Sequence, residues 1–540
     1  MSLKIVIVGG VAGGASAAAK ARRENENAEI TIYERGPYVS FANCGLPYYI
    51  GGDIKDRDNL LLMTPQKFWD KYRIQVKTLH EVLSIQRDQK LIRVKTPEEQ
   101  IIETPYDKLI LSQGASPIVP PFKGVTQNHV FTLRDVPDMD KIYTFLAKEK
   151  IQTAVVVGGG FIGLEMAEAL IHRHIKVTVI EKAPHILPLL DDDMAHELNR
   201  TLTEEKLSII SGMGVTEIGS DHVVLEDGKK IPAQMVLLSV GVRPEVTLAK
   251  EAGLEIGITG GVKANGRMES SDPDIYAVGD AAETRHLITG GRVRIALAGP
   301  ANRQGRIAGA NAAGKHLTYM GAMGTSIVRI LNRTVGYVGL NSKQAKDAGF
   351  SFFYSITRDP SHASYYPGAQ TVITKLLVEE GQGRILGAQV LGADGIDKRI
   401  DVLATAIYGG MTIHDLESID LAYAPPFGSA QDPINIAAFV ASNELRGDVK
   451  TIEASSLKNE KVFLIDVRDP DELEEFGKIP EAHNIPLIQL RDRLSEIPKD
   501  QKVVVYCQKG QRGYLGWKIL HQNGFQVYNL KGGFLEFRNS

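Results

Sequence analysis

The chain has 540 residues, of which 62 are Lys or Arg and 65 are Asp or Glu, so its formal net charge is −3. This balance gives no electrostatic basis for binding nucleic acid or an anionic membrane surface. No apolar run is long enough to span a bilayer, which also argues against a membrane protein. The two cysteines lie too far apart in sequence to suggest a disulfide framework, which favours a reducing, cytoplasmic location. The length predicts about three or four domains.

The chain begins with a predicted buried strand at residues 4–8, followed by a glycine-rich turn and a helix. A second strand, residues 30–33, ends at Glu34, about 20 residues after that turn. Such glycines admit a pyrophosphate to the helix N-terminus, and the acid accepts the ribose hydroxyls of a dinucleotide. Val11 occupies the middle glycine position of the usual G-x-G-x-x-G motif. The prediction therefore depends on the location of the turn between a strand and a helix. The predicted binding residues are Gly9, Gly10, Val11, Ala12, Gly13, Gly14, Glu34 and Arg35.

A second fingerprint follows the predicted strand at residues 155–157, and its three glycines are Gly158, Gly160 and Gly163. The next strand, residues 177–180, ends at Glu181. Two such units in one chain predict two dinucleotides. A carboxylate at Glu181 suits a free 2′-hydroxyl and repels a 2′-phosphate, so we expect NADH to be preferred. The neighbouring Lys182 leaves some tolerance for NADPH.

Cys44 lies in a turn-rich stretch, residues 40–49, directly after the first unit. The other cysteine, Cys507, is far away in sequence, so Cys44 has no nearby thiol with which to form a disulfide. A redox role therefore requires a sulfur from a bound small molecule, or a sulfenic acid on Cys44 itself. A free cysteine can also be a small buried hydrophobe. The stretch shows little of the periodicity of a core element, which favours the redox role.

Two further strand–glycine segments, residues 110–115 and 274–280, complete a pattern that resembles the two-dinucleotide flavoprotein disulfide reductases. In that superfamily the first unit holds FAD and the second holds NAD(P)H. The resemblance implies that Asp280 contacts the flavin's ribityl chain and that the segment from Leu297 to Arg306 begins the helix under the isoalloxazine ring. The further cofactor contacts that it implies are Ser112, Gly114, Gly241, Asp280 and Ala298.

The motif S-F-x-N-C-G-L-P-Y around Cys44 resembles, more narrowly, the coenzyme A-disulfide reductases and their close relatives. In those enzymes tyrosines of one subunit reach the cysteine of the other. The resemblance therefore implies a homodimer, coenzyme A as substrate or as a mixed disulfide with Cys44, and catalytic roles for Tyr365, Tyr366 and Tyr423. Each tyrosine could equally be a buried ring with its hydroxyl satisfied.

On the first predicted helix, Ser16, Lys20 and Arg23 are spaced so that they share one face. Cations there could bind the phosphates of coenzyme A, although from spacing alone an ordinary solvated helix face is the simpler interpretation. The resemblance implies the substrate-binding role, and the positions it implies, with Lys71 as a further candidate, are Ser16, Lys20, Arg23, Ser40, Asn43 and Lys71.

From about residue 324 the pattern changes to short alternating segments, residues 325–330, 335–339, 371–378 and 385–390, followed by a helix at 398–408. Alternation of this kind predicts an antiparallel sheet. The region resembles the dimerisation domain of the same superfamily.

After a predicted linker, residues 450–540 form a separate small α/β unit in which strand 503–506 delivers Cys507 into a loop closed by Arg512. Backbone amides facing the sulfur, together with Arg512, are expected to lower the thiol pKa below about 8.5. Four residues separate Cys507 from Arg512, whereas the related dual-specificity phosphatase loop has one more. The segment therefore resembles a rhodanese, in which both residues have catalytic roles.

The sequence thus predicts an α/β protein with four parts. They are an FAD-binding Rossmann-like domain (1–118 and 247–323), an NAD(P)H-binding one (119–246), an α+β dimerisation domain (324–446) and a rhodanese domain (450–540). The expected activity is NAD(P)H-dependent reduction of coenzyme A disulfide, persulfide or polysulfide through FAD and Cys44, with Cys507 relaying sulfane sulfur. No metal site is expected. Two alternatives stay open: an NADH oxidase or peroxidase that cycles Cys44 sulfenic acid, and a sulfur carrier or redox sensor.

Overall fold

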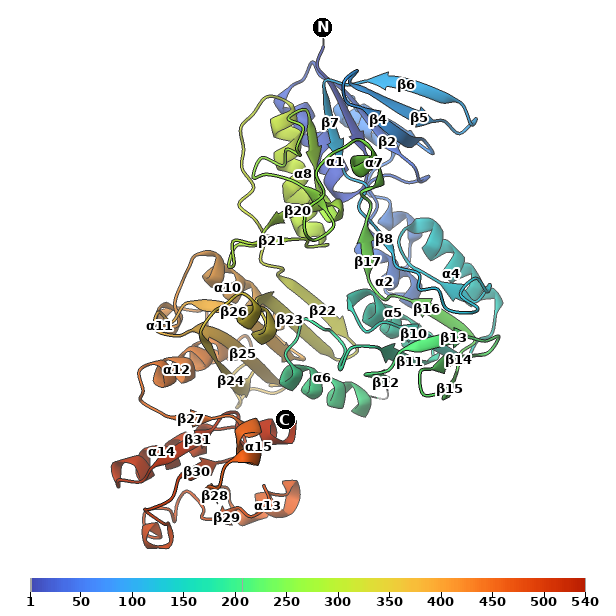
Figure 1. Cartoon of the computed structure of the whole chain (residues 1–540). Coiled ribbons are helices and arrows are strands. Elements are labelled where there is room, and N and C mark those ends of the chain that lie inside the picture. Colours follow the sequence, from blue (N-terminus) through green and yellow to red (C-terminus); the bar gives the residue numbers. More distant parts are fainter. Residues whose placement is uncertain (1, 206, 540) are drawn as a thin grey trace. The chain divides into compact units, whose positions relative to one another are not determined.

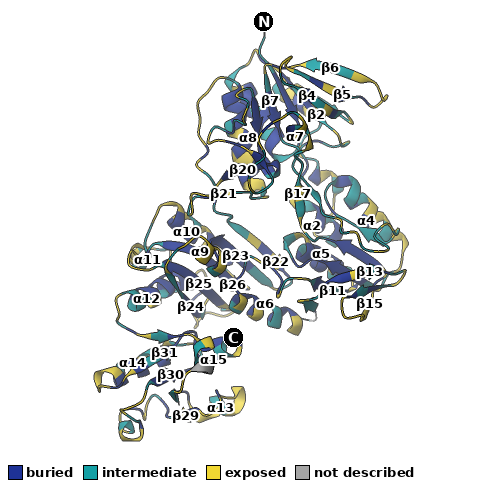
Figure 2. Cartoon of the chain, in the orientation of Figure 1, coloured by how far each residue is buried: buried dark blue, intermediate teal, exposed yellow. Residues whose placement is uncertain are grey.

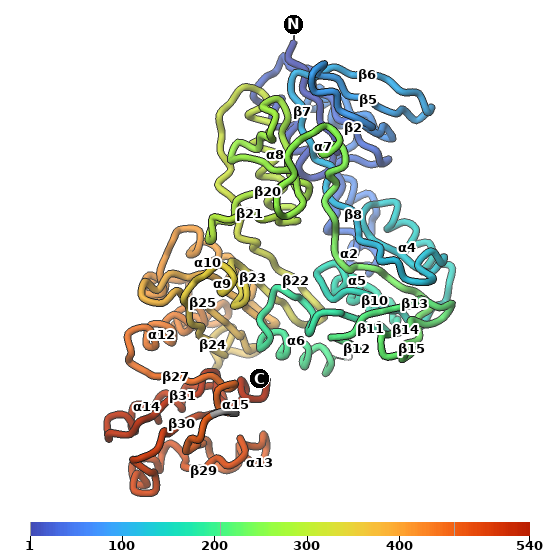
Figure 3. Tube along the Cα trace, in the orientation of Figure 1, coloured from blue at the N-terminus to red at the C-terminus, as the bar shows by residue number. Residues whose placement is uncertain are grey.

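The computed structural model describes residues 2–205 and 207–539, with backbone alone at 458 and 459. The chain forms two compact units, one of residues 1–186 and 207–324 and the other of residues 187–206 and 325–540. Figures 1 and 3 follow the chain through both units by residue number. Within the described residues, no helix combines the length and apolar character needed to cross a membrane.

The first unit contains a five-stranded sheet in the order β19-β7-β1-β2-β3, and all of its pairings are parallel. Its strands are β1 (Lys4–Val8), β2 (Glu29–Glu34), β3 (Gln75–Thr78), β7 (Lys108–Leu111) and β19 (Ile275–Ala277). The buried strand expected at residues 4–8 is β1, and helix α1 (Ala12–Glu24) follows its turn.

Helix α8 (Ala298–Ala312) packs closely against α1, and glycines make this approach possible. A Cβ atom on Gly305 would lie 2.1 Å from the Gly13 carbonyl oxygen, and one on Gly309 would lie 2.1 Å from that of Ala17. Any larger residue at these two positions would push the helices apart.

The second parallel sheet of this unit has the order β12-β11-β10-β16-β9. Its strands are β9 (Val130–Phe131), β10 (Thr153–Val157), β11 (Lys176–Glu181), β12 (Ser208–Ser211) and β16 (Met235–Leu238), and α5 (Phe161–His172) follows β10. Both strand–turn–helix units predicted from the glycine fingerprints are thereby confirmed.

Shorter elements connect and cover these sheets. They are α2 (Leu46–Gly51), α3 (Pro65–Tyr72), α4 (Val136–Lys148), α7 (Thr247–Glu251), β4 (Glu81–Gln86), β5 (Leu91–Lys95), β6 (Ile101–Pro105), β8 (Ala115–Pro117), β13 (Val215–Ile218), β14 (His222–Leu225), β15 (Lys230–Pro232), β17 (Val242–Pro244), β18 (Val262–Lys263), β20 (Ala282–Arg285) and β21 (Arg292–Val293).

The second unit is built on an antiparallel sheet in the order β22-β23-β26-β25-β24. Four strands match the predicted segments: β22 (Ser326–Ile330), β23 (Arg333–Gly339), β25 (Thr371–Glu379) and β26 (Ile385–Gly392). The helix expected at 398–408 is α10 (Ile396–Tyr408), which begins two residues earlier than expected. Its other helices are α6 (Asp192–Glu204), α9 (Ser342–Asp347), α11 (Ile413–Ser418) and α12 (Pro433–Leu445).

The edge strand β24 (Phe352–Pro360) was not predicted from the sequence. Its polar residues Ser355, Thr357 and Arg358 are buried, so the strand lacks the apolar–polar alternation that marks a half-exposed strand. Figure 2 shows the buried centre of this sheet in dark blue.

The last part of the second unit is a parallel sheet in the order β27-β31-β30-β28-β29. Its elements are β27 (Thr451–Ile452), β28 (Phe463–Asp466), β29 (His483–Asn484), β30 (Val503–Tyr506), β31 (Val527–Leu530), α13 (Pro470–Phe476), α14 (Gln511–Gln522) and α15 (Gly533–Asn539).

This last part packs against β24 through charged groups. Lys531 donates to the Tyr354 carbonyl oxygen at 2.9 Å, and Glu536 of α15 pairs with Arg358 at 3.1 Å. The ion pair is almost fully buried, because the side chains of Arg358 and Glu536 are 2% and 4% exposed. Packing as well as the short linker therefore positions this part on the antiparallel sheet.

Candidate active site

The first glycine turn is closed by the acid at the end of β2. The Gly10 and Gly36 backbone amides donate to the Glu34 carboxylate at 2.9 and 2.8 Å. Gly9 has φ +92°, and a Cβ there would lie 2.3 Å from the Ser112 carbonyl oxygen. A Cβ on Gly14 would lie 1.9 Å from the Gly9 carbonyl oxygen. Only glycine fits at these positions. The glycines allow a tight turn directly before α1, as dinucleotide binding requires.

The second turn repeats this arrangement. The amides of Gly159 and Ala183 donate to the Glu181 carboxylate at 2.7 and 2.8 Å. A Cβ on Gly163 would lie 2.0 Å from the Gly158 carbonyl oxygen, whereas one on Gly160 would meet nothing within 4 Å. The open space at Gly160 and the acid beside the turn fit a bound nicotinamide dinucleotide.

Lys182, the residue predicted to leave some tolerance for NADPH, pairs with a carboxylate other than that of Glu181. Its ammonium pairs with Glu226 at 3.2 Å. A 2′-phosphate beside Glu181 would have to compete with Glu226 for this cation.

The other predicted flavin contacts come from several segments of the first unit. Ser112 follows β7 and donates its amide to the Val8 carbonyl oxygen at 2.8 Å, and Gly114 (φ +71°) has nothing within 4 Å of its added Cβ. Val11 precedes α1, Ala12 begins it and Ala298 begins α8. The side chain of Arg35 is more than half exposed and lies 3.8 Å from Glu81. Gly241 has φ +108°.

Asp280 lies in a single 3₁₀ turn, Gly279–Ala281, after β19. Burial raises the pKa of its carboxyl, and Arg294 opposes that rise. The preceding Gly279 amide donates to Gln304 of α8 at 2.7 Å, which fixes the turn against that helix. With the tight glycine turn and Glu34, this arrangement fits FAD.

Cys44 lies in a 3₁₀ turn, Asn43–Gly45, directly before α2, and its thiol is exposed. The segment is tied to the first glycine turn, because the Ser40 amide donates to the Gly10 carbonyl oxygen at 2.8 Å. Ser40 has φ +48°, an uncommon conformation for a residue with a side chain. Although the thiol is accessible, desolvation by the surrounding protein raises its pKa, and the carboxyls of Glu165 and Asp280 raise it further.

Glu165 was not predicted from the sequence as a site residue. It lies on α5, and Tyr48 donates its hydroxyl to the Glu165 carboxylate at 3.3 Å. Burial raises the pKa of Glu165 to about 7, the Tyr48 hydrogen bond opposes this rise, and Glu168 adds to it. A carboxyl that titrates near neutrality therefore influences the Cys44 thiol.

The candidate coenzyme A residues on α1 differ in their availability. Ser16 donates to the Asn302 side-chain oxygen at 2.6 Å, and Arg23 is exposed. Lys20, in contrast, is buried and pairs with Glu24, one turn further along the helix. The spacing of Lys20 and Glu24 is itself a sequence signal for this pair.

The remaining substrate candidates lie near Cys44 in sequence or on α3. Asn43 is exposed, Ser40 is half-buried, and the Lys71 ammonium lies 5.2 Å from the centre of the Tyr72 ring. These roles in substrate binding remain predictions.

In the second unit, two of the three predicted tyrosines come together. The hydroxyls of Tyr365 and Tyr423 are 2.9 Å apart, and both side chains are exposed. Tyr366 instead packs edge-on against His362, with 5.7 Å between the ring centres.

A buried ion pair fixes the two tyrosine segments. Arg399 is bonded to the Asp432 carboxylate at 3.0 and 2.8 Å, and it also donates to the Ser361 carbonyl oxygen at 2.7 Å. In addition, the Ala363 amide donates to the Gly428 carbonyl oxygen at 2.9 Å. These contacts hold the segment before Tyr365 against the segment after Tyr423.

Cys507 directly follows the last residue of β30, Tyr506, and is 2% exposed. The Gly510 amide donates to its sulfur at 3.2 Å, and α14 begins at the next residue, Gln511. This is part of the amide cradle expected from the sequence.

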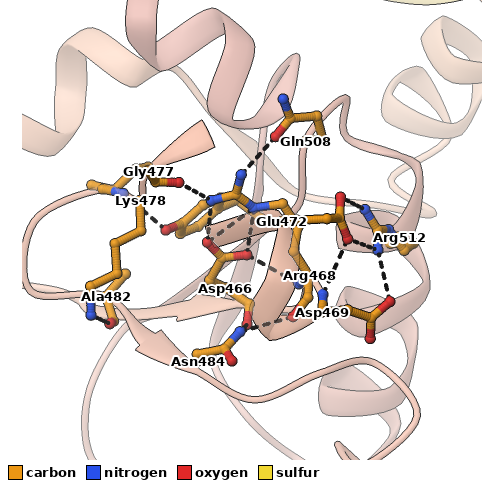
Figure 4. A network of polar contacts seen from close by, with 12 residues as sticks. Asp466, Arg468, Asp469, Glu472, Gly477, Lys478, Ala482, Asn484, Gln508 and Arg512 are labelled. Carbon is orange, nitrogen blue, oxygen red and sulfur yellow. Dashed lines mark hydrogen bonds and ion pairs between the residues drawn. The ribbon is translucent and has the colours of Figure 1, made fainter. Parts of the chain in front are cut away.

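Arg512, expected to face the sulfur, makes its hydrogen bonds elsewhere. Its two terminal nitrogens each donate to Glu472 of α13 at 2.6 Å, and Asp469 lies 3.7 Å away (Figure 4). Arg468 is buried, pairs with Asp466 at 2.7 Å and donates to the Gln508 side-chain oxygen at 2.7 Å. Glu472, Arg468 and Gln508 were not predicted from the sequence as parts of this site.

Comparisons with known proteins cover nearly all of the chain. Residues 3–305 match the pyridine nucleotide-disulphide oxidoreductase family, residues 325–432 match the dimerisation domain of that family, and residues 451–540 match the rhodanese-like domain. An NAD(P)H coenzyme A polysulfide/persulfide reductase of Pyrococcus horikoshii is 35% identical over 82% of this chain and 98% of its own. A coenzyme A disulfide reductase of Staphylococcus epidermidis is 33% identical over 81% of this chain and 99% of its own.

Among solved structures, reduced Bacillus anthracis CoADR-RHD is 42% identical, with a TM-score of 0.97 over 100% of this chain and 98% of that chain. The matched ranges agree with the two glycine turns, the antiparallel sheet and the Cys507 loop described above. The chain belongs to the pyridine nucleotide-disulphide oxidoreductase family and carries, after the dimerisation domain of that family, a rhodanese-like domain.

Proposed function

We propose that this chain is an FAD-dependent reductase that uses NAD(P)H to reduce coenzyme A disulfide, coenzyme A persulfide or polysulfide at Cys44. The observation that carries the proposal is the exposed Cys44 thiol, which lies on a segment bonded to the first glycine turn and is influenced by Asp280 and Glu165. The relatives named above, which act on coenzyme A disulfide or on polysulfide and persulfide, support this substrate class.

In this proposal, residues 1–118 and 247–323 bind FAD, and residues 119–246 bind NADH in preference to NADPH. Bound FAD supplies the transfer of an electron pair from the nicotinamide to sulfur. Glu34 and Asp280 are assigned to the flavin, and Glu181 is assigned to the adenosine ribose of the nicotinamide dinucleotide. The preference for NADH depends on the Glu181 carboxylate and on the engagement of Lys182 by Glu226.

The net reactions balance in sulfur, protons and electrons. Coenzyme A disulfide, NADH and a proton give two molecules of coenzyme A and NAD⁺. Coenzyme A persulfide, NADH and a proton give coenzyme A, H₂S and NAD⁺. The Cys44 thiolate attacks one sulfur of the substrate, a Cys44–sulfur bond forms, and the substrate S–S bond breaks with its electron pair on the leaving thiolate.

The leaving thiolate needs a proton, and Tyr365 and Tyr423 are proposed to donate it. Each subunit of a homodimer would present these tyrosines to Cys44 of the other, as the resemblance implies. Their mutual hydrogen bond at 2.9 Å supports a joint role. Tyr366 is assigned a smaller part, because its ring packs on His362.

Cys507 is proposed to accept sulfane sulfur from a donor and to pass it to coenzyme A, whose persulfide then reacts at Cys44. The amide of Gly510 at the Cys507 sulfur supports this role, because it can stabilise a sulfur anion.

The proposal is tested with Cys44→Ser in the flavin-loaded full chain. We expect the variant to lose turnover of coenzyme A disulfide and persulfide, while NADH still bleaches the flavin. Mass spectrometry of the thiol released from the purified wild type should find coenzyme A. Near-wild-type turnover of both substrates by Cys44→Ser would refute the assignment, and stoichiometric consumption of oxygen or peroxide per NADH by the wild type would favour an oxidase or peroxidase.

A further inference from the structure

The two arginines near Cys507, Arg468 and Arg512, are each paired with a carboxylate. The guanidinium of Arg512 lies within electrostatic range of the Cys507 sulfur, but its hydrogen bonds go to both oxygens of Glu472 at 2.6 Å. Such parallel, two-bond pairing is the strongest geometry between a guanidinium and a carboxylate. Figure 4 shows the Glu472 carboxylate facing the Arg512 guanidinium, with Asp469 beside it.

The second arginine near the loop is paired in the same way. Arg468 pairs with Asp466, and both side chains are fully buried. The Arg512 side chain is 33% exposed and that of Glu472 is 22% exposed, so a small molecule that reaches the loop also meets this carboxylate. The Arg512 hydrogen bonds lower the pKa of Glu472, which keeps it ionised at neutral pH.

These arginine–carboxylate pairs affect which sulfur donors can bind at Cys507. A small dianion such as thiosulfate brings two negative charges to the loop and needs cations that are free to bind it. In a partly buried site, a fixed carboxylate both occupies the cation and repels the incoming anion. A persulfide brings at most one charge, on the sulfur itself, where the Gly510 amide can receive it.

We propose that the Glu472–Arg512 ion pair makes Cys507 selective for persulfide donors of low charge and against dianionic thiosulfate. The inference rests on the proposed function, in which Cys507 accepts sulfane sulfur. In the transfer step the Cys507 thiolate attacks the outer sulfur of R–S–SH. A Cys507–sulfur bond forms, the donor S–S bond breaks, and R–S⁻ leaves with the electron pair and takes up a proton. With thiosulfate the same step would release sulfite.

The test uses the full-length, flavin-loaded protein without NADH, with cyanide as the common acceptor and thiocyanate as the product. This assay does not involve Cys44 reduction, so its outcome is independent of whether the reductase assignment is correct. For the wild type we expect kcat/KM with the persulfide of 2-mercaptoethanol, which carries no charge outside its S–S group, to exceed that with thiosulfate by about 100-fold or more. Comparable values for the two donors would overturn the proposal without any variant.

Glu472→Gln keeps the shape of the side chain and removes its charge. We expect kcat/KM for thiosulfate to rise by about tenfold, mainly through a lower KM, with a change of less than about threefold for the persulfide of 2-mercaptoethanol. A merely structural role for Glu472 would lower both rates together and would affect kcat. The matched control is Glu496→Gln, because Glu496 makes a similar two-bond pair with Arg493, at 2.7 Å for each bond, on the surface of the same domain.

The control should leave both donors unchanged. Glu472→Ala provides a second variant if Glu472→Gln folds poorly, since it also removes the charge beside Arg512. An unchanged or reduced thiosulfate rate in folded Glu472 variants would contradict the proposal.

Discussion

The hydroxyls of Tyr365 and Tyr423 lie 2.9 Å apart, although 58 residues separate them in sequence. This hydrogen bond raises the pKa of the Tyr423 hydroxyl. Because the two hydroxyls are hydrogen-bonded, we expect proton donation by one of them to depend on the other. The buried Arg399–Asp432 pair holds the segments that carry them.

We predict that Tyr365→Phe and Tyr423→Phe each lower kcat for coenzyme A persulfide by about 10- to 100-fold. The double variant should lose little more than either single one, because residues that act as a unit are not additive. Tyr366→Phe serves as the control and should have a smaller effect. Additive losses in the double variant would show that the two hydroxyls act independently.

Loss of the Asp432 carboxylate should destabilise the second unit strongly. Asp432→Ala leaves Arg399, whose side chain is 1% exposed, as an uncompensated buried charge, which typically costs roughly 3–5 kcal/mol. Asp448→Ala breaks a pair with Arg446 in which both side chains are more than 40% exposed, and it should cost about 0–1 kcal/mol. Thermal or denaturant unfolding of the two variants measures the difference, and equal destabilisation would contradict this account.

Glu165→Gln should make the Cys44 thiol easier to ionise. The Glu165 carboxyl has a pKa of about 7 and raises the pKa of the thiol when it is ionised. Below about pH 6 wild type and variant should therefore alkylate at similar rates, and above about pH 7 the variant should react faster with iodoacetamide. Because desolvation is the larger cause, the thiol pKa should stay above its ordinary value in the variant.

The control for this prediction is Glu99→Gln, which removes an exposed carboxylate elsewhere in the same unit. Its alkylation profile should match that of the wild type. A Glu165→Gln profile that coincides with the wild type at every pH would remove Glu165 from the site.

The local features of the fold were predictable, because their signals lie in short segments. Glycines that tolerate no side chain and an acid at the end of the next strand identify both turns, and the structure pairs Glu34 and Glu181 with those turns. The Glu472–Arg512 pair was not predictable in this way, since 40 residues separate its members and no periodicity links them. Strand β24 was missed for a related reason: a distant segment buries its polar residues, including Arg358.

Removing the carboxylate that pairs with Lys182 should increase the use of NADPH. In Glu226→Gln the Lys182 ammonium loses its charged partner and can approach a 2′-phosphate beside Glu181. We expect the ratio of kcat/KM for NADPH to that for NADH to rise by about two- to fivefold, because the pair is exposed and screened. Adding Lys182→Met to this variant should cancel the rise. NADPH used as well as NADH by the wild type would contradict the assumed effect of Glu181.

The last prediction concerns how Cys507 serves the reductase. Its domain is held on the antiparallel sheet by the buried Arg358–Glu536 pair and by Lys531, so packing, and not only the linker, sets its position. We propose that a free carrier, such as coenzyme A, moves the sulfur from Cys507 to Cys44. Cys507→Ser should therefore leave the NADH-dependent rate with preformed coenzyme A persulfide within about twofold of the wild type, because that substrate enters at Cys44. The rate with a bulky organic persulfide donor plus coenzyme A should fall by about tenfold or more, because loading of the carrier is lost. NADH oxidation and sulfide release measure both reactions in the same preparation. If the substitution lowers both rates equally, or neither, Cys507 does not relay sulfur to the reductase.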